Sequence, residues 1–251
     1  FLGRGRLPQR PVTAYLRELP KNGVAFDYAG TMPFSLRGQL CAGTFELEGD
    51  VSSQYVTGLL FALPLLAGTS RIRLLSRLES RPYVNLTLAC LRQFGITVTE
   101  TEDGYEIPGG QHYHAAEQTV EGDYSQAAFF YVANALGSRI RLTNLNPESA
   151  QGDKKVVEIV QEMCYNQSNG KPVFFTVDAA DIPDIVPILA VLATFGTAPS
   201  HITGAHRLAI KESDRLAATA DFLNRLGGNV TATADGLDIV PVKELHGGTV
   251  D

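Results

Sequence analysis

Apolar residues recur at three- and four-residue steps in two segments of the chain. The two rows are Val84, Leu88, Leu91 and Phe94, and later Leu216, Ala220, Leu223 and Leu226. Steps of three and four place side chains on one face of an α-helix, so each segment is predicted to be an amphipathic helix that covers a core. After each helix the chain turns at glycine and then alternates, in GITVTETEDGYEI (95–107) and in GGNVTATADGLDIV (227–240). An Asp-Gly pair divides each alternating stretch into two period-2 runs, which predicts a β-hairpin.

A longer pattern occurs more than once along the chain. Residues 45–76 and 119–145 both contain an EGD turn, Ser and Gln, an apolar helix, a turn with Gly, and a strand that reads Arg-Ile-Arg-Leu. Residues 175–204 form a weaker copy, and residues 7–30 have the helix, Gly turn and strand that end a unit. Such self-similarity is typical of a repeat architecture. We therefore expect α/β units, each a mixed set of strands with two helices, in a chain that starts partway through a unit.

One segment departs from this pattern. After the helix within 158–178, a glycine and a hairpin are expected, as in the two other copies. The sequence has only the short linker NQSNG before the next strand. Either the hairpin is shortened in the protein, or residues are absent from this chain.

Composition narrows the class of protein. The chain has 251 residues, 44% of them hydrophobic, which is enough for an ordinary core in one or two domains. Its apolar stretches, such as GLLFALPLLAG (58–68), are well short of the ~18 residues that a membrane span needs. A formal charge of -6 argues against binding to a nucleic-acid backbone, although a local cluster of Arg and Lys can still bind a small anion. Three distant cysteines and five histidines form no disulfide or metal pattern, so we expect a reducing compartment and no metal.

The stretch GDVSSQ (49–54) places two hydroxyls and a carboxamide, from Ser52, Ser53 and Gln54, at a predicted helix N-terminus. The unpaired N–H groups and the positive dipole end of a helix favour an anion there, and phosphate is the natural ligand. The alternative is an ordinary serine N-cap, which would serve the helix alone.

The stretch RLAIKESDRL (207–216) places Lys211 and Arg215 four residues apart. Both side chains are predicted to project from one face at a helix start and to reach one anionic ligand. Glu212, beside Lys211, is a candidate for proton transfer. The alternative is a solvated helix start in which these charges pair with one another.

The stretch DIPD (181–184) places Asp184 ahead of a wholly apolar helix, where a carboxylate can act as a base. The alternative is a first-turn acid that stabilises the helix dipole. Further anion-binding candidates, each of which would otherwise be a plain surface residue, are Arg10, Ser80, Arg81 and Tyr83.

Taken together, GDVSSQ, SRPY, GDYSQAAFF, DIPD and RLAIKESDRL resemble, in order and spacing, the motifs of the 5-enolpyruvylshikimate-3-phosphate synthase family of enolpyruvyl transferases. The resemblance spans almost the whole chain. It implies an inside-out α/β barrel fold of two similar halves, each built from βαβαββ units, with the active site between the halves. By analogy, residues 1–145 belong to the half that holds shikimate 3-phosphate, and residues 146–251 to the half that contains the family's chain ends. Both halves would be partial in this chain.

The resemblance also implies a reaction, in which the enolpyruvyl group of phosphoenolpyruvate is transferred to the 5-hydroxyl of shikimate 3-phosphate and phosphate is released. The roles it implies are phosphate binding by Ser52, Ser53 and Ser80, a shikimate ring site lined by Gln54 and Tyr83 with Arg81 adjacent, and phosphoenolpyruvate binding by Arg10, Lys211 and Arg215. Asp184 would take the proton from the hydroxyl, and Lys211 or Glu212 would protonate C3. We expect no cofactor, and a cytoplasmic monomer without nucleic-acid or membrane partners.

Several motifs of the family are not in these residues. They are a Lys-Ser pair, an Asn-Ala-Gly-Thr segment, and an Asp-His-Arg segment with a further Lys. A chain without them would lack part of the phosphoenolpyruvate site, so one alternative is a fragment that binds without turnover. Another is the related transferase that acts on UDP-N-acetylglucosamine, which uses a loop Cys and is not expected to carry SSQ with KESDR. Arg207 stands where a polar residue such as Asn is expected near the shikimate ring, so we leave it out of the catalytic set.

Overall fold

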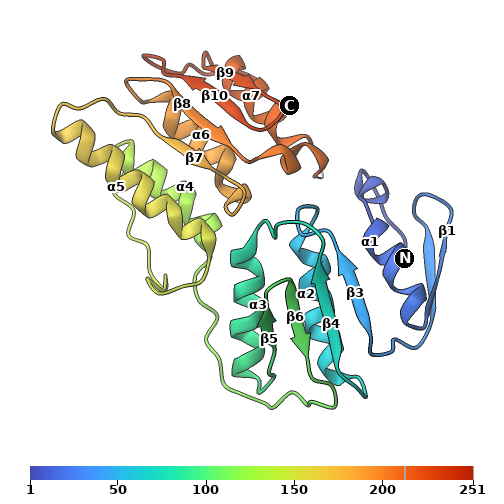
Figure 1. Ribbon diagram of the computed structural model, residues 1–251. Helices are drawn as coiled ribbons and strands as arrows, with labels where there is room; N and C mark the ends of the chain where they lie inside the picture. Colours follow the sequence, from blue (N-terminus) through green and yellow to red (C-terminus); the bar gives the residue numbers. More distant parts are fainter. Residues whose placement is uncertain (212, 251) are drawn as a thin grey trace. The chain divides into compact units, whose positions relative to one another are not determined.

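The computed structural model describes residues 1–211 and 213–250, and the chain divides into two compact units, Phe1–Thr119 and Val120–Asp251. Each unit has a hydrophobic core of its own. Figure 1 shows both units, with labels on the helices and strands where there is room. None of the helices in the described part of the chain is long and apolar enough to cross a membrane.

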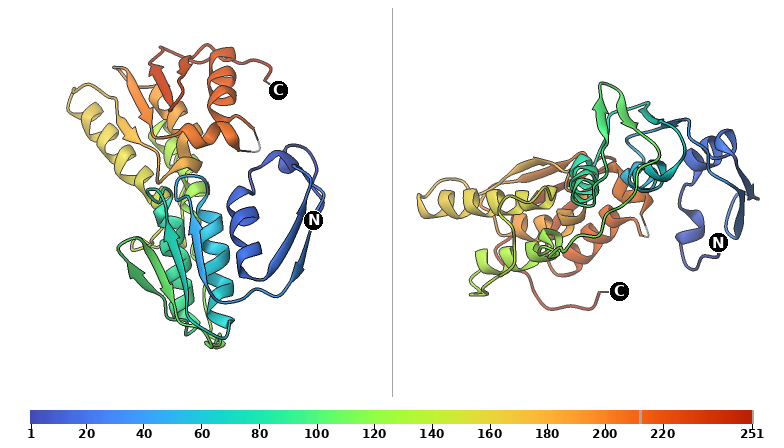
Figure 2. Two further views of the ribbon diagram at one scale, coloured as in Figure 1. Left: turned by 45° about the vertical axis from the view of Figure 1, so that its right-hand side comes forward. Right: turned by 90° about the horizontal axis from the view of Figure 1, so that it is seen from below.

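The first unit contains a separate hairpin and a four-stranded sheet. In chain order its elements are α1 (Thr13–Glu18), β1 (Val24–Tyr28), β2 (Phe34–Gly38), β3 (Thr44–Leu47), α2 (Ser53–Ala62), β4 (Ser70–Leu74), α3 (Arg81–Gln93), β5 (Thr99–Thr101) and β6 (Gly104–Ile107). Strands β1 and β2 pair with each other in antiparallel register, beside α1 in Figure 2. The sheet has the order β3-β4-β6-β5, in which only β3 and β4 are parallel.

The Arg-Ile-Arg-Leu pattern of β4 shows why this sheet has one buried face. Side chains alternate across a strand, so Ile72 points into the core while Arg71 and Arg73 point to solvent. On the solvent face Arg71 pairs with Asp103 at 2.7 Å, and Arg73 pairs with Glu46 at 2.9 Å. The buried face is covered by α2 and α3, and the amphipathic helix predicted around 84–94 is confirmed.

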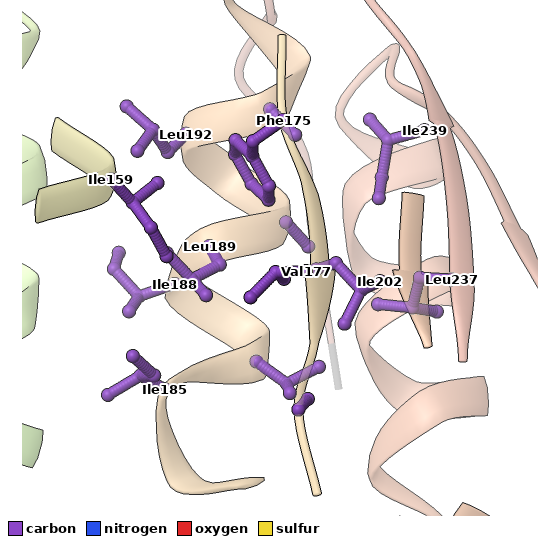
Figure 3. Packing of buried hydrophobic residues seen from close by; sticks show 14 of the residues in the cluster. Ile159, Phe175, Val177, Ile185, Ile188, Leu189, Leu192, Ile202, Leu237 and Ile239 are labelled. Atoms are coloured by element: carbon purple, nitrogen blue, oxygen red, sulfur yellow. The ribbon is translucent and has the colours of Figure 1, made fainter. Parts of the chain in front are cut away.

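The described residues of the second unit form four α-helices and a second four-stranded sheet. Its elements are α4 (Tyr124–Ala135), α5 (Lys155–Ser168), β7 (Thr176–Asp178), α6 (Val186–Thr194), β8 (Ser200–Thr203), α7 (Arg215–Arg225), β9 (Asn229–Ala232) and β10 (Leu237–Val240). The sheet order is β7-β8-β10-β9, with β7 and β8 parallel. Figure 3 shows Leu189 of the apolar helix α6 beside Val177 of β7, with Ile202 of β8 next to that strand.

The two sheets are copies of one another, down to their register. Phe45, Ile72 and Tyr105 form a row across the first sheet, and Val177, Ile202 and Leu237 form the same row across the second. The glycine of the Asp-Gly pair has the same role in both sheets. A Cβ on Gly104 would lie 2.0 Å from the Ile72 carbonyl oxygen, and a Cβ on Gly236 would lie 1.8 Å from that of Ile202. Only glycine allows this approach of the hairpin to the central strand. The predicted repeated βαβαββ α/β fold is confirmed.

The copy between these two has helices without strands. Helices α4 and α5 form, but residues 139–142, predicted as a strand, are assigned to no strand, and Ile140 is exposed. The strand prediction is therefore wrong for this segment. A strand needs a partner for its N–H and C=O groups, and in these residues a short linker follows α5 where the other copies have the hairpin that provides one. The segment before α4 and the segment after residues 139–142 still contact each other, because the Gly122 N–H donates to the Asn144 carbonyl oxygen at 2.6 Å.

The boundary between the units differs from the division expected at 145. Helix α4 precedes residue 145, yet Ala128 and Val132 of α4 belong to the same core as Ile159 of α5 and Leu189 of α6. The periodicity of α4 identified it as a helix, but it carried no information on which core the helix would join. Residues 120–145 therefore belong to the second compact unit.

Candidate active site

Parallel strands bring the candidate residues of each unit to one edge of its sheet. Helix α2 follows β3 and α3 follows β4, so both helices begin at the carboxyl ends of the parallel pair. In the second unit, the segments leading into α6 and α7 follow the parallel strands β7 and β8 in the same way. In open α/β sheets this edge is where ligands bind, because helix N-termini and loops converge there.

Helix α2 begins within the SSQ triplet. Ser52 is the N-cap, and its Oγ accepts a hydrogen bond from the Gln54 N–H at 3.3 Å. Ser52 therefore caps α2 as an acceptor, while its hydroxyl hydrogen can still be donated to a ligand. Within the described part of the chain, the Ser53 hydroxyl and the Gln54 carboxamide have no hydrogen-bond partner. Two side-chain polar groups thus remain for a ligand at the positive end of α2.

Helix α3 begins next to the second set of candidates. Ser80 is the N-cap residue, is 3% exposed, and has a left-handed backbone with φ 55°. A non-glycine residue in this region is uncommon, and such residues concentrate at functional sites. Arg81 is the first helical residue and contacts the Glu100 carboxylate, while Tyr83 lies in the first turn of the helix.

The loops that lead into α2 and α3 are bonded to each other. The Gly49 N–H donates to Ser76 Oγ at 2.9 Å, and the Glu79 N–H donates to the Gly49 carbonyl oxygen at 3.0 Å. A Cβ on Gly49 would lie 2.8 Å from the Ser76 carbonyl oxygen, so the close contact requires glycine. These bonds hold the SSQ and SRPY motifs side by side.

The second GD turn uses the same close contact with a different cap. Gly122 is bonded to Asn144, as Gly49 is bonded to its neighbouring loop. Here the aspartate is the N-cap, because Asp123 Oδ1 accepts the Ser125 N–H at 2.8 Å. The two copies of Gly-Asp-x-Ser therefore share the glycine contact and begin their helices two residues apart in register.

Arg10 lies beside α2 in the first unit. It follows the short helical turn Leu7–Gln9 and precedes Pro11, in an extended conformation that suits a residue before proline. The Pro11 carbonyl oxygen accepts a hydrogen bond from the Tyr55 hydroxyl of α2. Burial raises the pKa of Tyr55, and the positive charge of Arg10 acts in the opposite direction. The bond from Tyr55 therefore holds the backbone next to Arg10 against α2.

Two candidates of the second unit are in direct contact. Asp184 lies in the 3-10 turn Pro183–Ile185 ahead of α6, and Arg215 is the first residue of α7. Arg215 Nη1 lies 2.8 Å from Asp184 Oδ1, and both side chains are partly exposed. The pair combines a carboxylate and a guanidinium at the edge of the sheet, within reach of solvent.

The predicted placement of Lys211 on the helix is wrong. Helix α7 begins only at Arg215, because the Asp214 carboxylate accepts the Ala217 N–H at 3.0 Å and caps the helix there. Lys211 has an extended backbone after the 3-10 turn His206–Ile210, so it does not share a helix face with Arg215. Glu212, the candidate for proton transfer, lies outside the described residues.

Two charged side chains, the buried Arg207 and the partly buried Glu121, connect loops where the sequence predicted no functional role. Arg207 is 4% exposed, and its guanidinium donates to the Ala180 carbonyl oxygen at 2.7 Å, which ties the DIPD loop to the segment before α7. Glu121 accepts hydrogen bonds from Ser149 and Gln151. Burial acts to raise the pKa of Glu121, but these hydrogen bonds outweigh it and hold the pKa below 4.5. The sequence contained one signal for Glu121, because it is the acid of the second EGD turn and corresponds to Glu48 in the first.

The sequence of this chain is similar to that of known enzymes along its whole length. A family model described as EPSP synthase (3-phosphoshikimate 1-carboxyvinyltransferase) matches residues 1–251. The 3-phosphoshikimate 1-carboxyvinyltransferase of Clostridium beijerinckii is 41% identical over 261 residues, which cover 98% of this chain and 60% of the relative. That of Clostridium perfringens (strain ATCC 13124) is 39% identical over 262 residues, which cover 100% of this chain and 62% of the relative.

A solved structure agrees on the fold. EPSP synthase from Acinetobacter baumannii superposes with a TM-score of 0.71 at 23% identity, over 96% of this chain and 59% of that protein. The chain thus spans about 60% of the length of the relatives that it matches.

Proposed function

This chain belongs to the EPSP synthase family, and on that premise we propose that it supplies much of the active site of a 3-phosphoshikimate 1-carboxyvinyltransferase. The reaction joins C2 of phosphoenolpyruvate to the 5-hydroxyl oxygen of shikimate 3-phosphate, then eliminates phosphate to leave the enolpyruvyl ether. The observation that supports this most directly is that, within each unit, candidate residues lie at the carboxyl edge of a parallel strand pair: the SSQ and SRPY motifs in the first unit, and Asp184 and Arg215 in the second.

The first unit is proposed to hold shikimate 3-phosphate. Ser52 and Ser53 at the start of α2, with Ser80 at the start of α3, would bind its phosphate, because each lies at the positive end of a helix dipole. Gln54 and Tyr83 would line the ring site, and Arg81 would add positive charge beside it. The loop bonds through Gly49 support this assignment, since they bring both helix starts together.

The chemistry is proposed to depend on charged residues from both units. Arg10, Lys211 and Arg215 would hold phosphoenolpyruvate, whose anionic groups need fixed cations. Asp184 would accept the proton of the 5-hydroxyl as the C–O bond forms, and its contact with Arg215 at 2.8 Å orients the carboxylate. Lys211 or Glu212 would donate the proton that C3 gains in the addition. In the elimination, C3 returns a proton to the same group as the bond from C2 to phosphate breaks, which restores the double bond. These are an addition and an elimination with proton transfers, which draw on no metal or organic cofactor.

Phosphate release tests the proposal. The full-length protein, incubated with both substrates, should release phosphate and form the enolpyruvyl ether in equal amounts, and neither product should appear when one substrate is omitted. Lys211→Ala should reduce turnover strongly while the circular dichroism spectrum is retained. Absence of turnover in the folded full-length protein would refute the assignment.

A second candidate is favoured by the length of the chain, which covers about 60% of its relatives. On its own, the 251-residue chain would bind shikimate 3-phosphate through the first unit without turning it over. Calorimetric titration of this chain with shikimate 3-phosphate, next to the turnover assay, separates the two. We further propose a cytoplasmic monomer, which sedimentation and cell fractionation would test.

A further inference from the structure

Tyr55 directly follows the SSQ triplet and connects it to a distant part of the first unit. Its side chain is 8% exposed, and its ring lies 4.9 Å from the ring of Tyr15 between centroids, tilted by 60°. The aromatic rings therefore contribute to the core between α1 and α2. The two hydroxyl groups also form hydrogen bonds with the backbone.

Each tyrosine hydroxyl donates a hydrogen bond to a backbone carbonyl oxygen of the segment that carries the other tyrosine. The Tyr55 hydroxyl donates to the Pro11 carbonyl oxygen, and the Tyr15 hydroxyl donates to the Tyr55 carbonyl oxygen at 3.0 Å. Gly58, one turn further along α2, makes room for this arrangement, because a Cβ there would lie 2.6 Å from the Tyr15 hydroxyl. Each segment thus holds the backbone of the other, which fixes the Arg-Pro pair against α2.

Arg10 is the residue that this contact positions. Its carbonyl group forms the peptide bond to Pro11, whose ring fixes φ and removes the N–H, so few torsions separate the Tyr55 contact from the Arg10 backbone. The positive charge of Arg10 acts to lower the pKa of Tyr55, in keeping with the short chain path from Arg10 to the Tyr55 contact at Pro11.

We propose that Tyr55 is a positioning residue, whose hydroxyl holds Arg10 in the orientation needed for the second anionic substrate. The inference rests on the proposed function, in which Arg10 contacts phosphoenolpyruvate and Ser52 and Ser53 contact shikimate 3-phosphate. It gives Tyr55 a task that phenylalanine cannot perform, although phenylalanine would fill the same core volume. A purely structural tyrosine would lose stability on substitution without distinguishing the substrates.

The experiment compares Tyr55→Phe with a matched control on the same helix. Tyr113 also donates its hydroxyl to a backbone oxygen of α2, that of Phe61, at 2.7 Å, but near the opposite end from the SSQ triplet. In the full-length protein, Tyr55→Phe should raise the KM for phosphoenolpyruvate about three- to tenfold, the effect of one lost neutral hydrogen bond. The KM for shikimate 3-phosphate and kcat should change less than about twofold, and Tyr113→Phe should change none of them.

Hydrogen exchange of the peptide that covers residues 1–14 provides a readout independent of activity. Exchange in this peptide should be faster in Tyr55→Phe than in the wild type and in Tyr113→Phe. Unchanged exchange, or equal increases in both KM values with a lower kcat, would overturn the positioning role. Faster exchange with an unchanged KM for phosphoenolpyruvate would also overturn it. Absence of turnover in the wild type would instead refute the proposed function, while the exchange arm would still report whether Tyr55 anchors the segment.

Discussion

At the scale of single residues, the ion pair between Asp184 and Arg215 is central, because it joins two motifs that are 31 residues apart. Asp184→Asn keeps the shape of the side chain but cannot accept the hydroxyl proton. We expect kcat to fall by about 10²- to 10⁴-fold, the usual loss for a general base. Binding of shikimate 3-phosphate, measured by calorimetry, should persist.

Asp181→Asn is the matched control for this substitution, since it removes an acid from the same DIPD motif, three residues earlier. It should retain most of the turnover of the wild type. Full turnover by Asp184→Asn would show that another group takes the proton.

Gly49 gives a second prediction at this scale. A methyl group there would lie 2.8 Å from the carbonyl oxygens of Ser76 and Arg77, so Gly49→Ala must push the two loops apart. We expect a loss of about 1–3 kcal/mol in the free energy of unfolding, typical of overpacking, and weaker binding of shikimate 3-phosphate. Denaturant titration checks the first effect. Gly247→Ala, at a glycine with open space around it, should be neutral, and an equal loss there would contradict the steric argument.

The chemical types at the site could be predicted from the sequence, but their contacts could not. Ser52, Asp184 and Arg215 are recognisable because hydroxyls, a carboxylate and a guanidinium occur at predicted helix starts. Nothing in a linear pattern indicates that Arg215 contacts Asp184, or that the Tyr55 hydroxyl reaches Pro11 across 44 positions. Such contacts depend on how elements pack, which periodicity does not encode.

At the scale of elements, the start of α7 determines which charged residues share a helix face. Asp214 caps this helix, so Asp214→Ala should lower the free energy of unfolding by about 1 kcal/mol. Asp221→Ala on the same helix is the control, because its exposed pair with Arg225 is worth at most about 0.5 kcal/mol. Thermal unfolding of both variants measures the difference. Equal losses would mean that the cap contributes little.

Predicted elements failed where a neighbour was required. The helices around 84–94 and 216–226 were predictable because a helix forms its hydrogen bonds internally. Residues 139–142 alternate like β4, but a strand depends on a partner from elsewhere in the chain. The unexpected Lys211 position has a related origin, since a charge spacing of four fits a helix equally well before and after its true cap at Asp214.

At the scale of the whole molecule, the stability of the first unit should depend on pH through Glu18. Its side chain is 1% exposed and pairs with Arg17 at 2.7 Å and Lys21 at 2.9 Å. Burial acts to raise the pKa of Glu18, but the hydrogen bonds from Arg17 and Lys21 outweigh it and lower the pKa below 4.5. A lowered pKa in the folded state stabilises the protein above the unfolded pKa, and this contribution is lost as the pH falls through the folded pKa.

Glu18→Gln should therefore cost about 1–3 kcal/mol at neutral pH and much less in acid, because the charged hydrogen bonds are then lost in the wild type as well. Denaturant titrations from pH 7 down to about pH 3 measure this convergence. Glu117→Gln, at an exposed position, should follow the wild type throughout. A pH-independent difference between Glu18→Gln and wild type would exclude the carboxylate as its source.

The shared register of the two sheets gives this protein an internal replicate. Ile72 and Ile202 occupy the same place in their sheets. Each pairs with the hairpin residue that directly follows the glycine of the Asp-Gly pair. The flanking residues differ, with Phe45 and Tyr105 in one row and Val177 and Leu237 in the other. Two solutions to one packing problem are thus preserved within a single polypeptide. Exchanging the side chains of the two rows would show which residues the backbone geometry requires and which differ only because each copy diverged separately.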